Sequence, residues 1–170
     1  MVKEYQAPEV YTSYVARVPA LLKNGFRREE MTLIVRKRMP FIDKRIRNCA
    51  SLAPFPALLE GYKKGAIDEF SYRILYRDWL DMHFNADKTI EIIRRLGLKV
   101  FLCYETPNKF CHRHVFAEWL TAHGMICEEW APTYHYPAQP WQPPARPVPP
   151  ALPAPVPAVV QPSLWDIDSF

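Results

Sequence analysis

The chain has 170 residues, of which 49% are hydrophobic, and a formal net charge of +4, which suits one globular domain with a substantial core plus an appendage. Residues 1–10 lack the cationic region and apolar run of a signal peptide, and no stretch is long enough to span a bilayer. We therefore expect a cytoplasmic protein with no membrane partner. The four cysteines have no regular spacing, so they are expected to be reduced thiols.

Strand-like and helix-like segments alternate through residues 1–131. Strands are predicted at 9–14, 32–36, 99–104 and 125–130, and helices at 15–24, 58–64, 67–82, 86–96 and 111–124. The segment between the second strand and the second helix is predicted to be a loop. Because strands that alternate with helices form parallel sheets, the predicted fold class is α/β: a compact three-layer domain with a largely parallel sheet and flanking helices.

The densest chemical information lies where the third predicted strand gives way to a helix. Cys103 and Glu105 alternate onto one face of the strand end, and Cys111 and His112 fall in the first helical turn, on the side that faces the sheet. Arg113 lies at the edge of that face. Because open α/β sheets bind ligands at the carboxyl ends of their strands, these residues are predicted to line one crevice.

The residue types in this crevice favour an anion and a reactive thiol. The free N–H groups of a helix start attract an anion, and Arg113 can add a bidentate contact to phosphate or carboxylate. The same field is expected to lower the pKa of Cys111, which makes this residue the candidate nucleophile. Glu105 is then the candidate acid or base, and His112 an orienting or protonating group. The alternative is a pair of buried cysteines, a surface histidine and an arginine that lie close by chance.

Positive charge is concentrated after the second predicted strand. Six cations lie between residues 36 and 47: Arg36, Lys37, Arg38, Lys44, Arg45 and Arg47. Such a patch favours phosphates or polyanions, although a solvated loop would carry the same residues. The first predicted strand ends at the same edge of the sheet. The candidate anion-binding residues at this edge are Arg113, Ser13, Arg36 and Cys103.

The composition changes at Pro132. Twelve of the eighteen prolines lie from that residue onward, in a segment that cannot bury enough apolar surface to fold. Residues 132–160 are therefore predicted to be a disordered, semi-rigid spacer that prefers the polyproline II conformation.

The last ten residues, 161–170, contain a short motif. Gln161-x-Ser163-Leu164-Trp165 resembles the peptide that binds the bacterial DNA polymerase sliding clamp, usually Gln-x-Ser/Asp-Leu-Phe. The resemblance implies that Gln161 hydrogen-bonds at the rim of the clamp pocket while Leu164 and Trp165 fill its apolar interior. The alternative is a hydrophobic tail that docks on its own domain.

The core resembles the domain of unknown function 488 family, whose members carry a strand ending in Cys-x-Glu, a loop with proline, and a helix that opens with Cys-His-Arg. The matching residues are Cys103, Glu105, Pro107, Cys111, His112, Arg113, Ala117 and Leu120, within a resemblance that runs from about Tyr11 to Trp130. The resemblance implies a compact α/β domain over residues 1–131, and it implies no established reaction. The spacer and the terminal peptide depart from the usual length of the family.

Three hypotheses for function follow. The first is a bacterial or phage enzyme that acts on nucleotides or DNA bases and is tethered to the sliding clamp by its C-terminal peptide. The second is a non-catalytic protein that occupies the clamp pocket in competition with host replication factors, with a core that binds nucleic acid. The third is a zinc site built from Cys103, Cys111 and His112, with Cys49 or His83 as a further ligand. Adjacent Cys111 and His112 are awkward ligands for one tetrahedral ion.

Overall fold

The computed structural model describes residues 6–106 and 109–131. The predicted spacer and the clamp-like peptide, with Gln161, Leu164 and Trp165, lie outside the described residues. Along the chain the elements are β1 (Val10–Tyr14), η1 (Val15–Arg17), α1 (Val18–Lys23), η2 (Arg28–Glu30), β2 (Met31–Leu33), β3 (Arg47–Asn48), η3 (Ala50–Leu52), α2 (Pro56–Lys63), α3 (Glu69–His83), α4 (Ala86–Arg95), β4 (Val100–Cys103), α5 (His112–Ala122) and β5 (Cys127–Glu129). Over the described ranges, no helix has the length and apolar character needed to cross a membrane.

The five strands form one parallel sheet in the order β3-β2-β4-β1-β5. The central strand β4 is buried along its whole length, as expected for a parallel strand that is covered on both faces. The predicted α/β class and largely parallel sheet are confirmed. Tyr14 pairs with Cys103 in the register of β1 and β4, so both strands end at the same edge of the sheet.

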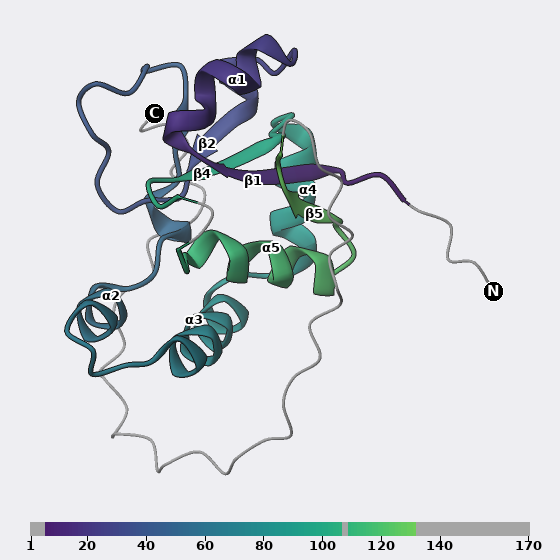
Figure 1. Ribbon diagram of the computed structural model, residues 1–170. Helices are drawn as coiled ribbons and strands as arrows, with labels where there is room; N and C mark the ends of the chain where they lie inside the picture. The colour runs from purple at the N-terminus through teal and green to yellow at the C-terminus, as the bar shows by residue number, and fades with distance from the viewer. Residues whose placement is uncertain (1–5, 107–108, 132–170) are drawn as a thin grey trace.

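Helices and a long loop cover the two faces of the sheet (Figure 1). On one face, side chains of α3, α4 and α5 pack in a single core around Phe101, whose ring lies 5.1 Å from that of Phe116. On the other face, α1 contributes Leu21 and the loop between β2 and β3 contributes Ile42 and Ile46, all buried. The sheet is therefore the middle layer, and the second outer layer is part helix and part loop.

The amino end of α5 differs from those of α3 and α4. The side chains of Asp68 and Asn85 cap α3 and α4, because they accept hydrogen bonds from the backbone N–H of Ser71 at 2.7 Å and of Lys88 at 3.0 Å. Cys111 occupies the N-cap position of α5 in extended backbone and makes no side-chain capping hydrogen bond. The helix α5 thus begins beside the end of β4 without the oxygen cap of the other two helices.

Two expectations about the second strand are corrected. The strand β2 ends at Leu33 rather than near residue 36, and Arg47–Asn48 forms β3 within the segment predicted to be a loop. The strand β3 is a two-residue edge strand that pairs Thr32 with Arg47. A strand this short has no apolar alternation, and a charged residue is acceptable at a sheet edge, so the sequence pattern does not reveal it.

Candidate functional site

Cys103 and Cys111 lie together at the junction between β4 and α5. Cys103 is the last residue of β4, Cys111 is the N-cap residue of α5, and both are buried. Their Sγ atoms are 2.7 Å apart, with Cys111 as the donor and Cys103 as the acceptor. The pair is therefore arranged as one thiol that donates a proton to a second sulfur.

His112 is held against both sulfurs in one orientation. Its Nε2 lies 2.6 Å from the backbone oxygen of Ile34, and a carbonyl can only accept, so Nε2 carries a proton. Its Nδ1 is 3.6 Å from Cys111 Sγ and 3.9 Å from Cys103 Sγ. The ring of Tyr76 packs edge-on against the imidazole. Nδ1 is therefore the histidine atom that can exchange a proton with the thiol pair.

The two thiols have opposite acidities. The hydrogen bond from Cys111 lowers the pKa of Cys103 by more than burial raises it, and His112 and the backbone N–H of Glu105 lower the pKa further. Burial raises the pKa of Cys111, and the adjacent Cys103 sulfur raises it again. This corrects the expected low pKa of Cys111, because burial and a neighbouring negative sulfur outweigh the field of the helix start. The direction of the hydrogen bond and the two opposite pKa shifts favour Cys103 as the thiolate and Cys111 as its hydrogen-bond donor.

Arg113 is fully buried and already paired inside the protein. Its Nε donates to Glu129 Oε2 at 3.1 Å, and its Nη1 donates to the backbone oxygen of Glu105 at 2.7 Å. The expected two-donor contact with an anion is not free in this arrangement. Of its three nitrogens, Nη2 has no hydrogen-bond partner among the described residues. Arg113 therefore links the segment that follows β4, through Glu105, to the end of β5, through Glu129.

Glu129 is a site residue that the sequence pattern does not single out. It pairs with Thr12 in the register of β1 and β5, and its Oε2 accepts from Thr12 Oγ1 at 2.6 Å as well as from Arg113. His114 Nε2 lies 3.8 Å from the same oxygen. The available signal is a carboxylate at the end of a predicted strand. The contact of Glu129 with Thr12 could not be predicted from the sequence, because these residues are more than 100 positions apart and meet only through the pairing of β1 with β5.

The remaining candidate residues lie at the same edge of the sheet in different surroundings. Glu105 is exposed and takes part in the site through its backbone N–H and carbonyl groups. Ser13 is fully buried, and its Oγ has no hydrogen-bond partner among the described residues. Arg36 is exposed, and its Nη1 donates to the backbone oxygen of Pro54 at 3.2 Å. Of the predicted anion-binding residues, Arg36 is thus the one that presents a charge to solvent.

Tyr104 fastens the loop after β2 to this edge of the sheet. Its hydroxyl donates to the backbone oxygen of Lys37 and accepts from the backbone N–H of Met39, each at 2.9 Å. Tyr104 directly follows Cys103, so the same strand end holds both the thiolate and the loop. Figure 1 shows the loop extending beyond this end of the sheet, on the side of α1.

The group with metal-ligand geometry, within the part of the chain that the structure describes, is Cys103, Cys111 and His112, whose ligand atoms lie within 4.8 Å of one another. Two sulfurs and an imidazole whose second nitrogen donates to a carbonyl suit zinc. Around a tetrahedral zinc ion two sulfurs are about 3.7 Å apart, so the Sγ atoms at 2.7 Å would have to separate. Neither further ligand expected from the sequence belongs to the group: Cys49 contacts Ser51, and His83 stacks on Trp79.

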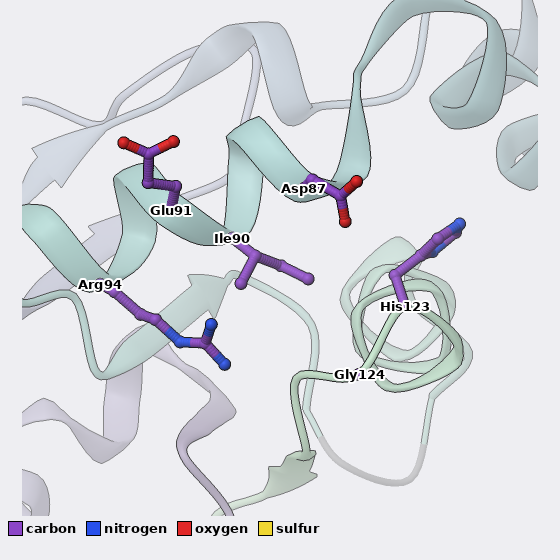
Figure 2. A pocket seen from close by; sticks show the side chains of 6 residues that line it. All are labelled: Asp87, Ile90, Glu91, Arg94, His123 and Gly124. Atoms are coloured by element: carbon purple, nitrogen blue, oxygen red, sulfur yellow. The ribbon is translucent and has the colours of Figure 1, made fainter.

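A surface hollow of about 290 Å³ lies at the other end of α5. It is lined by Asp87, Ile90, Glu91, Arg94, His123 and Gly124 (Figure 2). The helix α5 has 11 residues, which places the hollow about 16 Å from the thiol pair. Arg94 is paired with Glu9, and His123 Nδ1 bonds the backbone oxygen of Trp119. The hollow is therefore separate from the candidate site and holds no comparable chemistry.

Comparison of the chain with protein-family models, with curated proteins and with solved structures finds no match. The resemblance to the domain of unknown function 488 family therefore stays a prediction.

Proposed function

We propose that this protein is a cytoplasmic enzyme that acts on nucleotides or DNA through the thiolate of Cys103. The observation that carries the proposal is the donor–acceptor pair of Cys111 and Cys103, 2.7 Å apart at the start of α5, with His112 Nδ1 beside it. A thiolate that is stabilised by a donated hydrogen bond is a nucleophile at neutral pH. Cys111 holds a proton next to the thiolate, and His112 Nδ1 can accept one, so both residues can take part in proton transfer during a reaction.

Two features support a phosphate-bearing substrate. Basic residues gather beside the site, and Arg36 presents its charge to solvent at this edge. The terminal peptide resembles the sliding-clamp motif, and we propose that Gln161, Leu164 and Trp165 bind a bacterial clamp. A protein tethered in this way would meet DNA and its precursors where DNA is synthesised.

The test of the core is a search for a thiolate-dependent change in a defined set of substrates. The full chain is incubated with the four deoxynucleoside monophosphates and with a mixed-sequence oligonucleotide, and protein and nucleic acid are analysed by mass spectrometry. We expect an adduct on the protein or a mass change in the substrate that Cys103→Ser abolishes and Cys49→Ser retains. No change in any substrate, or equal change with Cys103→Ser, contradicts the proposal.

The test of the tail is separate. A peptide of residues 161–170 should bind an immobilised bacterial sliding clamp with micromolar affinity, since a short ligand must be ordered on binding. Changing Leu164 and Trp165 to alanine should abolish binding, because these side chains supply the buried apolar area. If the peptide binds while the core changes no substrate, the non-catalytic competitor becomes the better account.

A second candidate function, a zinc site, is favoured by the proximity of three ligand atoms. Metal analysis of the full chain purified without chelators tests it. The result that supports a zinc site is one zinc ion per chain in the unchanged protein and none in Cys103→Ser or Cys111→Ser. Cys103 would then be a zinc ligand, and this role would replace the thiolate mechanism. Protein free of zinc that also fails to bind Co²⁺ with a thiolate charge-transfer band would exclude this candidate.

A further inference from the structure

The segment 36–47 carries more positive charge than the chain as a whole. Its six cations and single carboxylate give a net charge of +5, whereas the chain has +4. The carboxylate, Asp43, is held by Arg28 Nε at 2.7 Å and by Arg45 Nη2 at 2.8 Å. Lys37 and Lys44 are exposed and make no ion pair with any described residue. These charges lack a complement within the described residues, which suits a polyanionic partner.

Phe41 lies between the two groups of cations of this segment in the sequence, and its side chain is exposed. Its side chain is 78% exposed, while the next residue, Ile42, is buried and anchors the loop. An exposed aromatic ring among cations is the combination that binds single-stranded nucleic acid, because the ring stacks on a base and the cations meet phosphates. A duplex offers the same phosphates but keeps its bases stacked on one another.

The loop is held in shape before any partner binds. Arg38 directs its guanidinium inward: Nη1 donates to the backbone oxygen of Ile46 at 2.7 Å, and Nη2 donates to the backbone oxygens of Ile42, at 3.0 Å, and Asp43. Ile42 and Ile46 are both buried in the core beneath. One cation therefore fixes the backbone while others face outward, which reduces the ordering cost of binding.

Two contacts connect the loop to the thiol pair. Tyr104, next to Cys103, bridges the backbone of Lys37 and Met39, and His112 bonds the backbone oxygen of Ile34 just before the loop begins. These contacts hold the loop and the buried Cys103 at the same edge of the sheet.

We propose that segment 36–47 binds a single strand of nucleic acid, with Phe41 stacking on a base, and presents that strand to Cys103. The inference rests on the proposed function and narrows its substrate class from free nucleotides to a strand. Its cationic side chains provide phosphate contacts whatever the sequence, so binding should be sequence-tolerant and sensitive to salt.

The test measures the affinity of the full chain for fluorescein-labelled oligothymidylate by anisotropy over a range of salt concentrations. Phe41→Ala should weaken binding by about tenfold, because the ring no longer stacks on a base. Lys37→Ala with Lys44→Ala should weaken binding and reduce the salt slope by about 0.7 for each phosphate that is no longer neutralised. The matched controls are Phe70→Ala, a ring 38% exposed on α3, and Lys63→Ala with Lys64→Ala at the end of α2. They should bind as the unchanged protein does.

Several outcomes would overturn the inference. The first is that Phe41→Ala leaves the affinity for oligothymidylate unchanged. The second is that the protein binds a duplex as tightly as the single strand. The third is that the protein binds phosphatidylserine vesicles in a Phe41-dependent way and does not bind oligothymidylate. Two separate readouts distinguish this inference from the proposed function. Strand binding is judged by the oligothymidylate affinity of Phe41→Ala, and the thiolate mechanism is judged by the loss of substrate change in Cys103→Ser. A failed thiolate mechanism would therefore leave Phe41-dependent strand binding in place, whereas failed strand binding would overturn this inference and leave the thiolate assay unaffected.

Discussion

The junction between β4 and α5 and the loop 36–47 lie at the same edge of the sheet, yet they balance charge in opposite ways. At the junction the polar groups are buried and contact one another: Cys111 donates to Cys103, and Arg113 pairs with Glu129. In the loop most of the charges face solvent. The buried region thus fixes its own protonation through internal contacts, whereas the loop leaves a net positive charge exposed at its surface.

The largest expected effect on stability comes from removing the buried ion pair between Arg113 and Glu129. Arg113→Met should lower the free energy of unfolding by about 3 kcal/mol, because it leaves the Glu129 carboxylate without its cation. Urea unfolding of the two proteins measures the difference. Arg73→Met is the control, since the half-exposed ion pairs of Arg73 with Glu69 and Glu118 should contribute less than about 1 kcal/mol. Equal losses in both variants would remove the distinction between buried and exposed charge.

The thiol pair should form a disulfide under mild oxidation. The Cys103 thiolate attacks oxidised glutathione and releases one glutathione thiolate, and the Cys111 sulfur then displaces the second, to which its proton passes. Closing so short a loop should raise the free energy of unfolding by about 2 kcal/mol. Peptide mass analysis should find Cys103 joined to Cys111 and free thiols at Cys49 and Cys127. A mixed disulfide between Cys103 and glutathione should accumulate only in the control variant Cys111→Ser. Its accumulation in the unchanged protein would contradict this arrangement.

His114 should make the fold sensitive to acid. Burial, with smaller contributions from the charges of Arg113 and Arg73, lowers the pKa of His114 to about 4. Glu129 lies 3.8 Å away, but its Oε2 already accepts from Arg113, so burial prevails. Because the folded pKa is below the ordinary value of 6.5, the stability from the neutral ring is complete above pH 6.5 and is lost as the pH falls toward 4.

Replacement of His114 by glutamine should therefore flatten the fall in unfolding free energy between pH 6.5 and 4. The difference in slope should be at most about 1.4 kcal/mol per pH unit, the limit for one proton. Denaturant titrations at several pH values in this window measure the slopes. Parallel curves for the two proteins would show that the ring does not titrate as a buried group.

The smallest expected effect is on stability in the loop. Phe41→Ala should change the free energy of unfolding by less than about 0.5 kcal/mol, because the residue is 78% exposed and belongs to neither core cluster of the described residues. The same change should weaken oligothymidylate binding about tenfold. A large loss of stability would show that Phe41 belongs to the core and would remove the contrast with the junction.

The sequence predicts the junction because its signals are local. A short apolar strand before Cys103 and a helical pattern after Cys111 suffice to bring the two cysteines together where the strand meets the helix. The acidities of the thiols could not be predicted, since they depend on burial and on a contact between two sulfurs. Nor could the sequence give Arg113 its partner, because Glu129 reaches it only through the pairing of β5 with β1.

The identity of the thiolate is the central claim, and competitive alkylation tests it most directly. The full chain is treated with limiting iodoacetamide over a pH series, and the labelled fraction of each cysteine is measured by peptide mass spectrometry. Cys103 should react first and at a rate that changes little with pH near neutrality, because its pKa is lowered. Cys49 and Cys127, whose pKa values burial raises, should react only at higher pH. Labelling of Cys111 before Cys103, or an order that follows exposure with the half-buried Cys49 first, would contradict the account.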